Sequence, residues 1–573
     1  MIKEISFKNY KAFEFGKIEL KPITLLLGAN SVGKSSIVQL LLMLQQTYET
    51  KKYKSVLKLN GEFISLGETL NILKDKDKTK TLSLKFKFVS EELYNFIKTD
   101  GLKQLSANLI ETISYIQRIY NKPLLENELN IALHDKKSNK RDLLRNFTIS
   151  SKKQLLELVS IIKKAKSELF VKNKFKTSLF DNYVNEIWFF DERISNAIRF
   201  VDEIEKTYDL LLSLNTIENE DFSISFELKC IDNKKGTFFK ICCISIHNNE
   251  KCVLKLEMKP DQRREIYTAF KLNSDYSKLD FINEKITTEL EDNINYNSTF
   301  FSIVEDCDSK YVYNENIKIS SFSKIILKLI SIANLEIGYS FEKHNINHVS
   351  PLRAHPKRYY FLDKANITTH LDTLDGNSLT EILKENDSLR RKVNNWLSNF
   401  GLMLNVDTLQ DIIHIIKIKQ NNLSLDITDV GFGISQVLPV IVQGFLSFDK
   451  SLTIIEQPEI HLHPIMQADL ADLFVDIATQ KSGKKISPCK YLLIETHSEY
   501  LLKRLRRRMS ENEKINSDNV AIYYFHPRNE ENTGIIERKE INSTGFFDYP
   551  KDFYSGELLR DNTEFLKHQI KNK

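Results

Sequence analysis

Two segments at opposite ends of the chain carry residues whose types and spacing suit the binding of a phosphorylated ligand. Near the start, an apolar run at 23–27 leads into the spacing G-x-x-x-x-G-K-S, which consists of Gly28, Ala29, Asn30, Ser31, Val32, Gly33, Lys34 and Ser35, with Ser36 next. Glycines let the backbone curl so that successive N–H groups point at phosphate oxygens, and the positive end of a following helix adds to this. The pattern predicts a P-loop for ATP, with Lys34 on the β- and γ-phosphates and the Ser35 hydroxyl on Mg²⁺.

The second segment is an apolar run at 452–455 that ends in Glu456, Gln457, Pro458 and Glu459. A carboxylate at the end of a buried strand suits Mg²⁺, so Glu456 is predicted to bind the metal directly or through water. A third apolar run, at 491–494, leads to His497. A histidine at that strand end is predicted to donate a hydrogen bond to the γ-phosphate. Each feature is commonplace alone, and the P-loop upstream is what favours a nucleotide site.

A glycine-rich element at 429–436 precedes a predicted helix at 436–445 and includes Gly433, Ser435 and Gln436. The exposed N–H groups of a helix N-terminus suit a γ-phosphate. The alternative is a glycine turn that merely starts a helix. Because the element lies only about twenty residues before Glu456, it is not expected to serve the nucleotide of its own subunit.

The elements that must position these residues follow from the periodicity of the apolar residues. Strands are predicted by alternating or continuous apolar runs at 2–7, 16–20, 23–27, 81–88, 222–230, 237–246 and 253–258. Helices are predicted at 35–46, 323–333 and 377–400, and the stretch 90–220 has helical periodicity throughout, most clearly at 153–170. The simplest account is an α/β fold in which an antiparallel β-subdomain is interrupted by a helical insertion.

Composition narrows the class of protein. The chain has 573 residues, of which 41% are hydrophobic and 28% charged, as in globular proteins with two or three domains. The net charge of +5 does not demand a polyanionic partner. No two of the six cysteines have zinc-site spacing, which favours free thiols in a reducing cytoplasm. We expect no signal peptide, because the N-terminal residues lack the charged, apolar and small-residue pattern of one. We expect no membrane span, because no apolar run reaches about 18 residues.

These motifs together resemble the ABC-type ATPase heads of the SMC, RecF and OLD-like class. The segments 456–464 and 495–501, with Pro351-Leu352-Arg353 and the tail 545–550, are similar to stand-alone ATPases of bacterial anti-phage operons, such as the Septu-type ATPase subunit. The resemblance implies a head-to-tail homodimer or higher homo-oligomer, in which Gly433, Ser435 and Gln436 cap the partner's nucleotide. It also implies an effector partner, such as an HNH nuclease. The predicted organisation is 1–89 and 346–573 for the ATPase head, 90–221 for the insertion and 222–345 for the β-subdomain and connecting loops.

Two departures from the family pattern bear on activity. The usual signature reads Leu-Ser-Gly-Gly-Gln, whereas here Phe432-Gly433-Ile434-Ser435-Gln436 displaces the serine. The position after Glu456 normally holds the catalytic glutamate and is Gln457 here. An amide can orient water but cannot accept its proton, so we expect tight ATP binding with slow or partner-triggered hydrolysis. Glu459 is either a substitute base or, the favoured interpretation, a structural residue.

Basic residues leave a nucleic-acid partner open. Arg504, Arg507 and Arg508 share one face of a predicted helix, where they either bind a phosphate backbone or form a solvated face, the favoured interpretation. Arg353 either lines a nucleotide or nucleic-acid groove or is plain packing. The alternative function is therefore a DNA-repair or DNA-binding clamp ATPase of the RecF or SMC type without an effector. An intrinsic nuclease is disfavoured, because no clustered acids for two metals follow His497.

Overall fold

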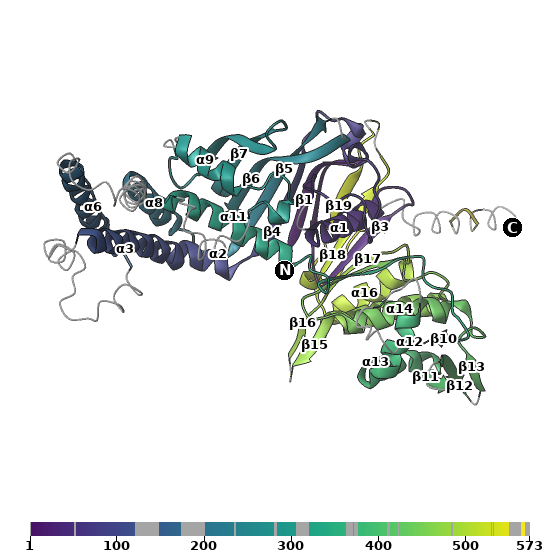
Figure 1. Ribbon diagram of the computed structural model, residues 1–573. Helices are drawn as coiled ribbons and strands as arrows, with labels where there is room; N and C mark the ends of the chain where they lie inside the picture. Colours follow the sequence, from purple (N-terminus) through teal and green to yellow (C-terminus); the bar gives the residue numbers. More distant parts are fainter. Residues whose placement is uncertain are drawn as a thin grey trace. The chain divides into compact units, whose positions relative to one another are not determined.

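In the computed structural model, the chain folds into two compact units (Figure 1). The first comprises Met1–Thr50, Leu57–Phe86 and Ile337–Lys573, and the second comprises Lys51–Val56 and Lys87–Glu336. The described residues are 2–50, 53–120, 148–173, 201–233, 236–279, 284–304, 320–361, 371, 376–409, 413–421, 423–482, 485–528, 530, 532–548, 563–565 and 567. The domain boundaries drawn from the sequence stay a prediction.

A six-stranded sheet with the order β19-β18-β3-β17-β14-β9 forms the centre of the first unit. Its strands are β3 (Ile23–Gly28), β9 (Ile346–Val349), β14 (Leu452–Glu456), β17 (Tyr491–Glu495), β18 (Val520–His526) and β19 (Ile535–Lys539). The strands from β18 to β9 run parallel, and β19 pairs antiparallel with β18. Strands buried on both faces have continuous apolar sequences, so the runs at 23–27, 452–455 and 491–494 are confirmed as strands.

Helices and a small second sheet complete the core of this unit. The helices are α1 (Lys34–Tyr48), α12 (Asn377–Glu385), α13 (Asp387–Leu397), α14 (Phe432–Leu446), α15 (Pro464–Ala478) and α16 (Glu499–Glu511). The small sheet contains β10 (Tyr360–Phe361), β11 (Leu402–Leu409), β12 (Ile413–Gln420) and β13 (Leu423–Asp426). Apolar side chains of α12 to α16 share one core with the central strands. The strands between 402 and 426 lie outside the sequence predictions.

In the first unit, β2, β1 and β4 are neighbours in this order, and β1 pairs antiparallel with β2. They are β1 (Glu4–Tyr10), β2 (Phe13–Glu19) and β4 (Leu82–Val89), and the chain passes into the second unit within β4. The β1–β2 connection is tight, with Asn9 and Lys11 at positive φ. The short elements of the first unit are η1 (Thr69–Ile72), η2 (Lys74–Lys76), η5 (Ser398–Phe400), η6 (Ser517–Asn519), β15 (Thr479–Ser482) and β16 (Lys485–Pro488).

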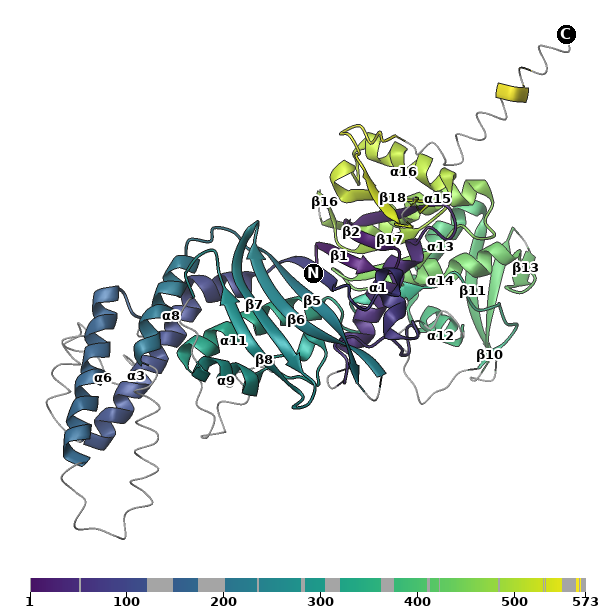
Figure 2. The same ribbon diagram turned by 90° about the horizontal axis from the view of Figure 1, so that it is seen from above.

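The second unit joins a β-meander to a group of helices. The meander consists of β5 (Asp221–Asn233), β6 (Gly236–Asn248), β7 (Lys251–Asp261) and β8 (Ile266–Asn273). The helices include α2 (Glu91–Asn95), η3 (Phe96–Asp100), α3 (Gly101–Tyr120), α6 (Lys152–Asn173), α8 (Val201–Leu214), α9 (Glu284–Asn293), η4 (Phe300–Ser302) and most of α11 (Ser321–Tyr339). Helices α3, α6 and α8 lie side by side (Figure 2).

The α/β fold with an antiparallel β-subdomain interrupted by a helical insertion is thus confirmed. The predicted helix at 153–170 corresponds to α6, whereas β8 lies outside the sequence predictions. Within the described ranges, none of the helices has both the length and the apolar character that crossing a membrane requires.

Candidate nucleotide site

The loop between β3 and α1 has the geometry of a P-loop, and two of its positions admit only glycine. Gly28 has a φ of +141°, and a Cβ there would lie 2.5 Å from the carbonyl oxygen of Phe525. Gly33 has a φ of +108°, and its Cβ would lie 2.7 Å from the Phe13 ring. Ser31, between them, also has a positive φ. The loop therefore curls back on itself in front of the α1 N-terminus, as an anion-binding loop must.

Lys34 is folded into this loop rather than extended into solvent. Its Nζ donates hydrogen bonds to the carbonyl oxygens of Gly28 at 3.0 Å and Ala29 at 2.7 Å, and it lies 3.8 Å from a carboxylate oxygen of Glu495. Burial lowers the pKa of Lys34, and the charges of Glu495 and Glu459 oppose that shift. The ammonium group is therefore held where phosphate oxygens would meet it, and its contact with the β- and γ-phosphates stays a prediction.

Sheet order explains which acids come near the P-loop. In the parallel register, Glu495 of β17 pairs with Leu26 of β3 on one side and with Glu456 of β14 on the other. Glu495 therefore lies between the P-loop strand and the strand that ends in Glu456. Its Oε2 accepts a hydrogen bond from the Ser35 hydroxyl at 3.2 Å. Burial raises the pKa of Glu495, Lys34 opposes the shift, and Glu456 adds to it.

Glu456 instead contacts a residue from the next strand. Its Oε1 lies 2.8 Å from Nε2 of His348 on β9. Hydrogen bonds of this kind orient a carboxylate and are frequent around metal ligands. The oxygen-rich set formed by Ser35, Glu456 and Glu495 has the hard donor chemistry that Mg²⁺ prefers, so the residues present fit this ion. Of the predicted metal ligands, Ser35 lies in the first turn of α1 and contacts Glu495, whereas Glu456 ends β14, which β17 separates from β3.

The residues after Glu456 have different surroundings. Gln457, at a φ of 45°, donates its N–H to the Glu495 carbonyl at 2.7 Å and lines the cavity in front of the P-loop. The carboxyl group of Glu459 is buried and accepts the N–H of His497 at 2.6 Å, and burial raises its pKa. Gln457 therefore faces the candidate nucleotide position, whereas Glu459 holds the loop that carries His497.

His497 brings a neutral imidazole to the site. Burial lowers its pKa to about 4, and the charge of Lys34 acts in the same direction. Its Nε2 is buried and has no hydrogen-bond partner among the described residues. A neutral ring with an unpartnered nitrogen beside the P-loop lysine suits the predicted hydrogen bond to a γ-phosphate.

One cavity is shared by the P-loop, Gln457 and Glu495, whereas Glu456, Glu459 and His497 are not among its lining residues. Its volume is about 770 Å³, within the range of roughly 300–1,000 Å³ that is common for small-molecule sites. The predicted residues that line it are Asn30, Ser31, Gly33, Lys34, Ser35, Ser36 and Gln457, and Glu495 joins them. The other lining residues include Lys11, Gln39, Asn71, Asp75 and Arg528.

The glycine-rich element differs from its prediction, because helix α14 starts at Phe432 instead of Gln436. Gly433 lies inside the first turn, where a Cβ would come within 2.5 Å of the His461 carbonyl oxygen. The Ser435 hydroxyl donates to the Phe432 carbonyl at 2.7 Å, and both Ser435 and Gln436 are buried. The exposed residues of this element are therefore Asp429, Gly431 and Phe432.

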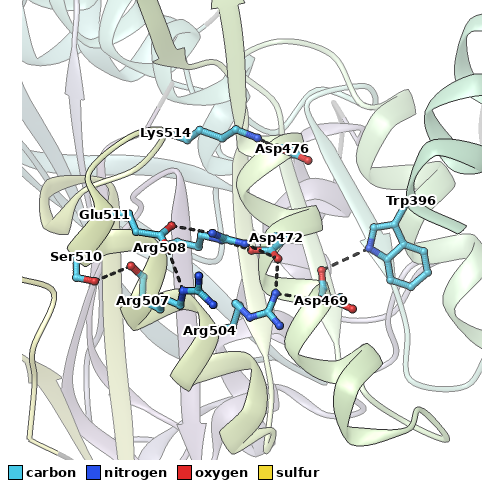
Figure 3. Close-up of polar contacts among 10 residues, drawn as sticks. All are labelled: Trp396, Asp469, Asp472, Asp476, Arg504, Arg507, Arg508, Ser510, Glu511 and Lys514. Atoms are coloured by element: carbon cyan, nitrogen blue, oxygen red, sulfur yellow. Dashed lines mark hydrogen bonds and ion pairs between the residues drawn. The ribbon is translucent and has the colours of Figure 1, made fainter. Parts of the chain in front are cut away.

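The basic face of α16 is occupied by acids of the neighbouring helix α15 (Figure 3). Arg504 contacts Asp469 at 2.9 Å and Asp472 at 2.6 Å, and Arg508 contacts Asp472 and Glu511. Arg507, more exposed, pairs with Glu511 within the same helix. Arg504 and Arg508 thus hold α15 against α16, a role that neither of the sequence interpretations included.

Three residues of the site were missed or left undecided by sequence reasoning. No role is predicted for Glu495 from the sequence. Its place at the end of an apolar strand is nevertheless the same signal that marks Glu456. His348 has no sequence signal beyond its position on a short strand. For Arg353, the sequence allows either the lining of a groove or plain packing. In the structure its side chain is buried against the main chain of Glu456 and Gln457.

The P-loop, the acids on adjacent strand ends and the shared cavity define a P-loop nucleotide-binding ATPase site. The model of the AAA ATPase domain family matches residues 1–502, and the chain belongs to this family. No curated protein sequence matches the chain. The fold is α/β, with a mixed central sheet and a P-loop after β3.

Two solved structures have low similarity to the chain. The SMC head domain from Thermotoga maritima is 8% identical, with a TM-score of 0.31, over 94% of this chain and 99% of that chain. The Smc head domain with an extended coiled coil, bound to the C-terminal domain of ScpA and derived from Pyrococcus furiosus, is 9% identical, with a TM-score of 0.32, over 94% and 96%. Similarity at this level is too low to assign a function.

Proposed function

We propose that this ATPase binds ATP with Mg²⁺, hydrolyses it slowly and dimerises head-to-tail in the ATP-bound state. The observation that carries the proposal is the cavity that joins the P-loop to Gln457 and Glu495. Lys34 and the loop N–H groups bind the phosphates, and Ser35 and Glu456 hold the metal. Bound Mg²⁺ would supply charge neutralisation on the phosphate oxygens.

Slow hydrolysis rests on the residue that faces the cavity. Gln457 can hold a water molecule by hydrogen bonds but cannot take its proton. Glu459 could accept a proton, but its carboxyl group is buried and engaged with the His497 N–H. Its role is to hold His497, whose Nε2 senses the γ-phosphate.

The cap over a partner's nucleotide comes from the first turn of α14. The N–H groups of Gly431, Phe432 and Gly433 lie at the exposed helix N-terminus, where they donate hydrogen bonds to the γ-phosphate of the partner's nucleotide. Ser435 and Gln436 stay predicted contacts, and Ser435 would contribute only after its hydroxyl leaves the Phe432 carbonyl. Each cap serves the other subunit, so ATP holds the dimer together.

We further propose that the ATP-held dimer is the regulatory or sensor subunit of a bacterial anti-phage complex that controls a toxic effector, such as an HNH nuclease. The support is the similarity of segments 456–464, 495–501 and 545–550 to ATPases of such operons. The ion pairs that occupy Arg504 and Arg508 weaken the case for a DNA clamp, because those charges already have partners.

The test combines three measurements on the purified full chain. Binding of a fluorescent ATP analogue, molar mass in solution with and without ATP and Mg²⁺, and phosphate release are compared between the wild type and Lys34→Ala. We expect binding, an ATP-dependent doubling of mass and slow turnover, all lost in the variant. An unchanged mass would refute the ATP-held dimer. Salt-dependent retention of duplex DNA by the wild type would favour the clamp instead.

A further inference from the structure

Arg353, in the loop after β9, connects two parts of the site that are far apart in sequence. Its Nη1 donates to the carbonyl oxygen of Gln436 in α14 at 3.1 Å. Its Nη2 donates to the carbonyl oxygens of Glu456 at 2.7 Å and Gln457 at 3.3 Å. One rigid guanidinium plane therefore ties the first part of α14 to the end of β14.

The charge of Arg353 is held at an energetic cost. The residue is 6% exposed, and its Nε has no hydrogen-bond partner among the described residues. Burial lowers its pKa to about 10, and the charges of Glu459 and Glu456 oppose the shift. An apolar side chain would avoid the desolvation, so packing alone does not account for a guanidinium here. Its distinctive property is a planar fork that fixes several acceptors at once.

The first turn of α14 precedes a weak point of that helix. Pro439 lies inside the helix and has no N–H, so the Ser435 carbonyl lacks its helical donor and the helix is weakened there. Ile434 of this turn is buried in the apolar core, whereas Phe432 and Gln436 contact loops. The ring of Phe432 lies 4.9 Å from that of His461 and 5.3 Å from that of His355, and Gln436 Nε2 donates to the Ala354 carbonyl.

The other end of the connection is the backbone of Gln457, at the wall of the phosphate cavity. Gln457 lines the phosphate cavity and has a positive φ, which is a strained conformation for a residue with a side chain. Its N–H is bonded to β17 and its carbonyl to Arg353. A shift of the Glu456–Gln457 peptide units would therefore move the guanidinium and, through Nη1, the first turn of α14.

We propose that Arg353 is a positioning residue that couples nucleotide occupancy of its own P-loop site to the first turn of α14. The inference rests on the proposed function, in which that turn caps the nucleotide of the second subunit. Through Arg353, the first turn of α14 in each head changes position only when the P-loop site of the same head is filled. Nucleotide binding at the two sites of a dimer therefore becomes cooperative.

The test is hydrogen–deuterium exchange of the full chain with and without ATP and Mg²⁺, in the wild type, Arg353→Lys and Arg353→Gln. In the wild type we expect ATP to slow exchange both at the P-loop and in peptides covering 431–440. At 431–440 the expected factor is about tenfold, which corresponds to the gain of one charge-assisted hydrogen bond. Both variants should keep the P-loop response and lose most of the response at 431–440. Arg390→Lys is the matched control, because Arg390 also donates to two main-chain carbonyls, those of Leu383 and Lys384, away from the cavity.

The outcomes separate this inference from the function on which it rests. If the P-loop of the wild type shows no response, nucleotide binding fails and the coupling fails with it. If the P-loop responds while 431–440 responds equally in the wild type and both variants, the coupling through Arg353 is refuted and nucleotide binding stands. Equal loss in Arg390→Lys would likewise refute a specific role. Loss of the P-loop response in both Arg353 variants would make Arg353 a structural residue and overturn the proposal.

Discussion

Gln457→Glu is predicted to convert a slow ATPase into a faster one. Gln and Glu have the same shape, so the substitution leaves the packing unchanged and supplies only a proton acceptor. Gln457 lines the phosphate cavity, and its backbone is fixed by the Glu495 carbonyl and Arg353. The new carboxylate would therefore lie where an attacking water must be deprotonated.

The size of the effect follows from general-base catalysis, which typically contributes about 10²- to 10⁴-fold. We expect the lower end, about 10²-fold or about 2.7 kcal/mol of barrier, because Glu456 and Glu495 on adjacent strand ends already disfavour a third charge. The same repulsion should raise the pKa of the new carboxyl group, which favours proton acceptance near neutral pH.

The assay is phosphate release at saturating ATP and Mg²⁺, with Lys34→Ala as the inactive control. Glu459→Gln is the matched control, since its amide oxygen can still accept the His497 N–H. We expect Glu459→Gln to lose far less than the factor of about 10² that removal of a general base costs. Brisk turnover by the wild type that Glu459→Gln abolishes, or a Gln457→Glu variant no faster than the wild type, would refute the reasoning.

Three further substitutions test the site and the fold. Gly33→Ala should weaken ATP binding by at least about tenfold in an equilibrium titration, because the Cβ meets the Phe13 ring at a φ of +108°; unchanged affinity would show that the loop tolerates a side chain. Asp472→Asn should cost about 1–2 kcal/mol in chemical unfolding, since Asp472 bridges the partly buried Arg504 and Arg508; Asp476→Asn, which removes an exposed pair with Lys514, should cost less, and equal costs would contradict this ranking. In the second unit, burial lowers the pKa of Lys240 to about 8. Between about pH 8 and 10.5 the unfolded chain therefore binds more protons than the folded chain. The free energy of unfolding should rise with pH in that window, by about 3 kcal/mol at most. Lys240→Met should remove this rise, and the same pH dependence in the variant would exclude Lys240 as its source.

Local sequence was sufficient wherever a residue's role depends on its immediate neighbours along the chain. The P-loop was predictable because its glycines, lysine and serine lie within eight residues between a buried strand and a helix. Glu456 and His497 were placed at strand ends for the same reason, since an apolar run marks the strand and its last residue marks the edge of the sheet. The α/β class and the helical insertion followed from periodicity alone.

Only the tertiary structure decided which strand ends are neighbours. The order β3-β17-β14-β9 brings Glu495 to Ser35, separates Glu456 from the P-loop by one strand and supplies His348 as its partner. The contacts of Arg353 span about a hundred residues of sequence, and the burial of Ser435 depends on where α14 starts. Parallel strands are joined by long crossovers, so their adjacency is set by the packing of helices on the sheet and leaves no pattern in the local sequence.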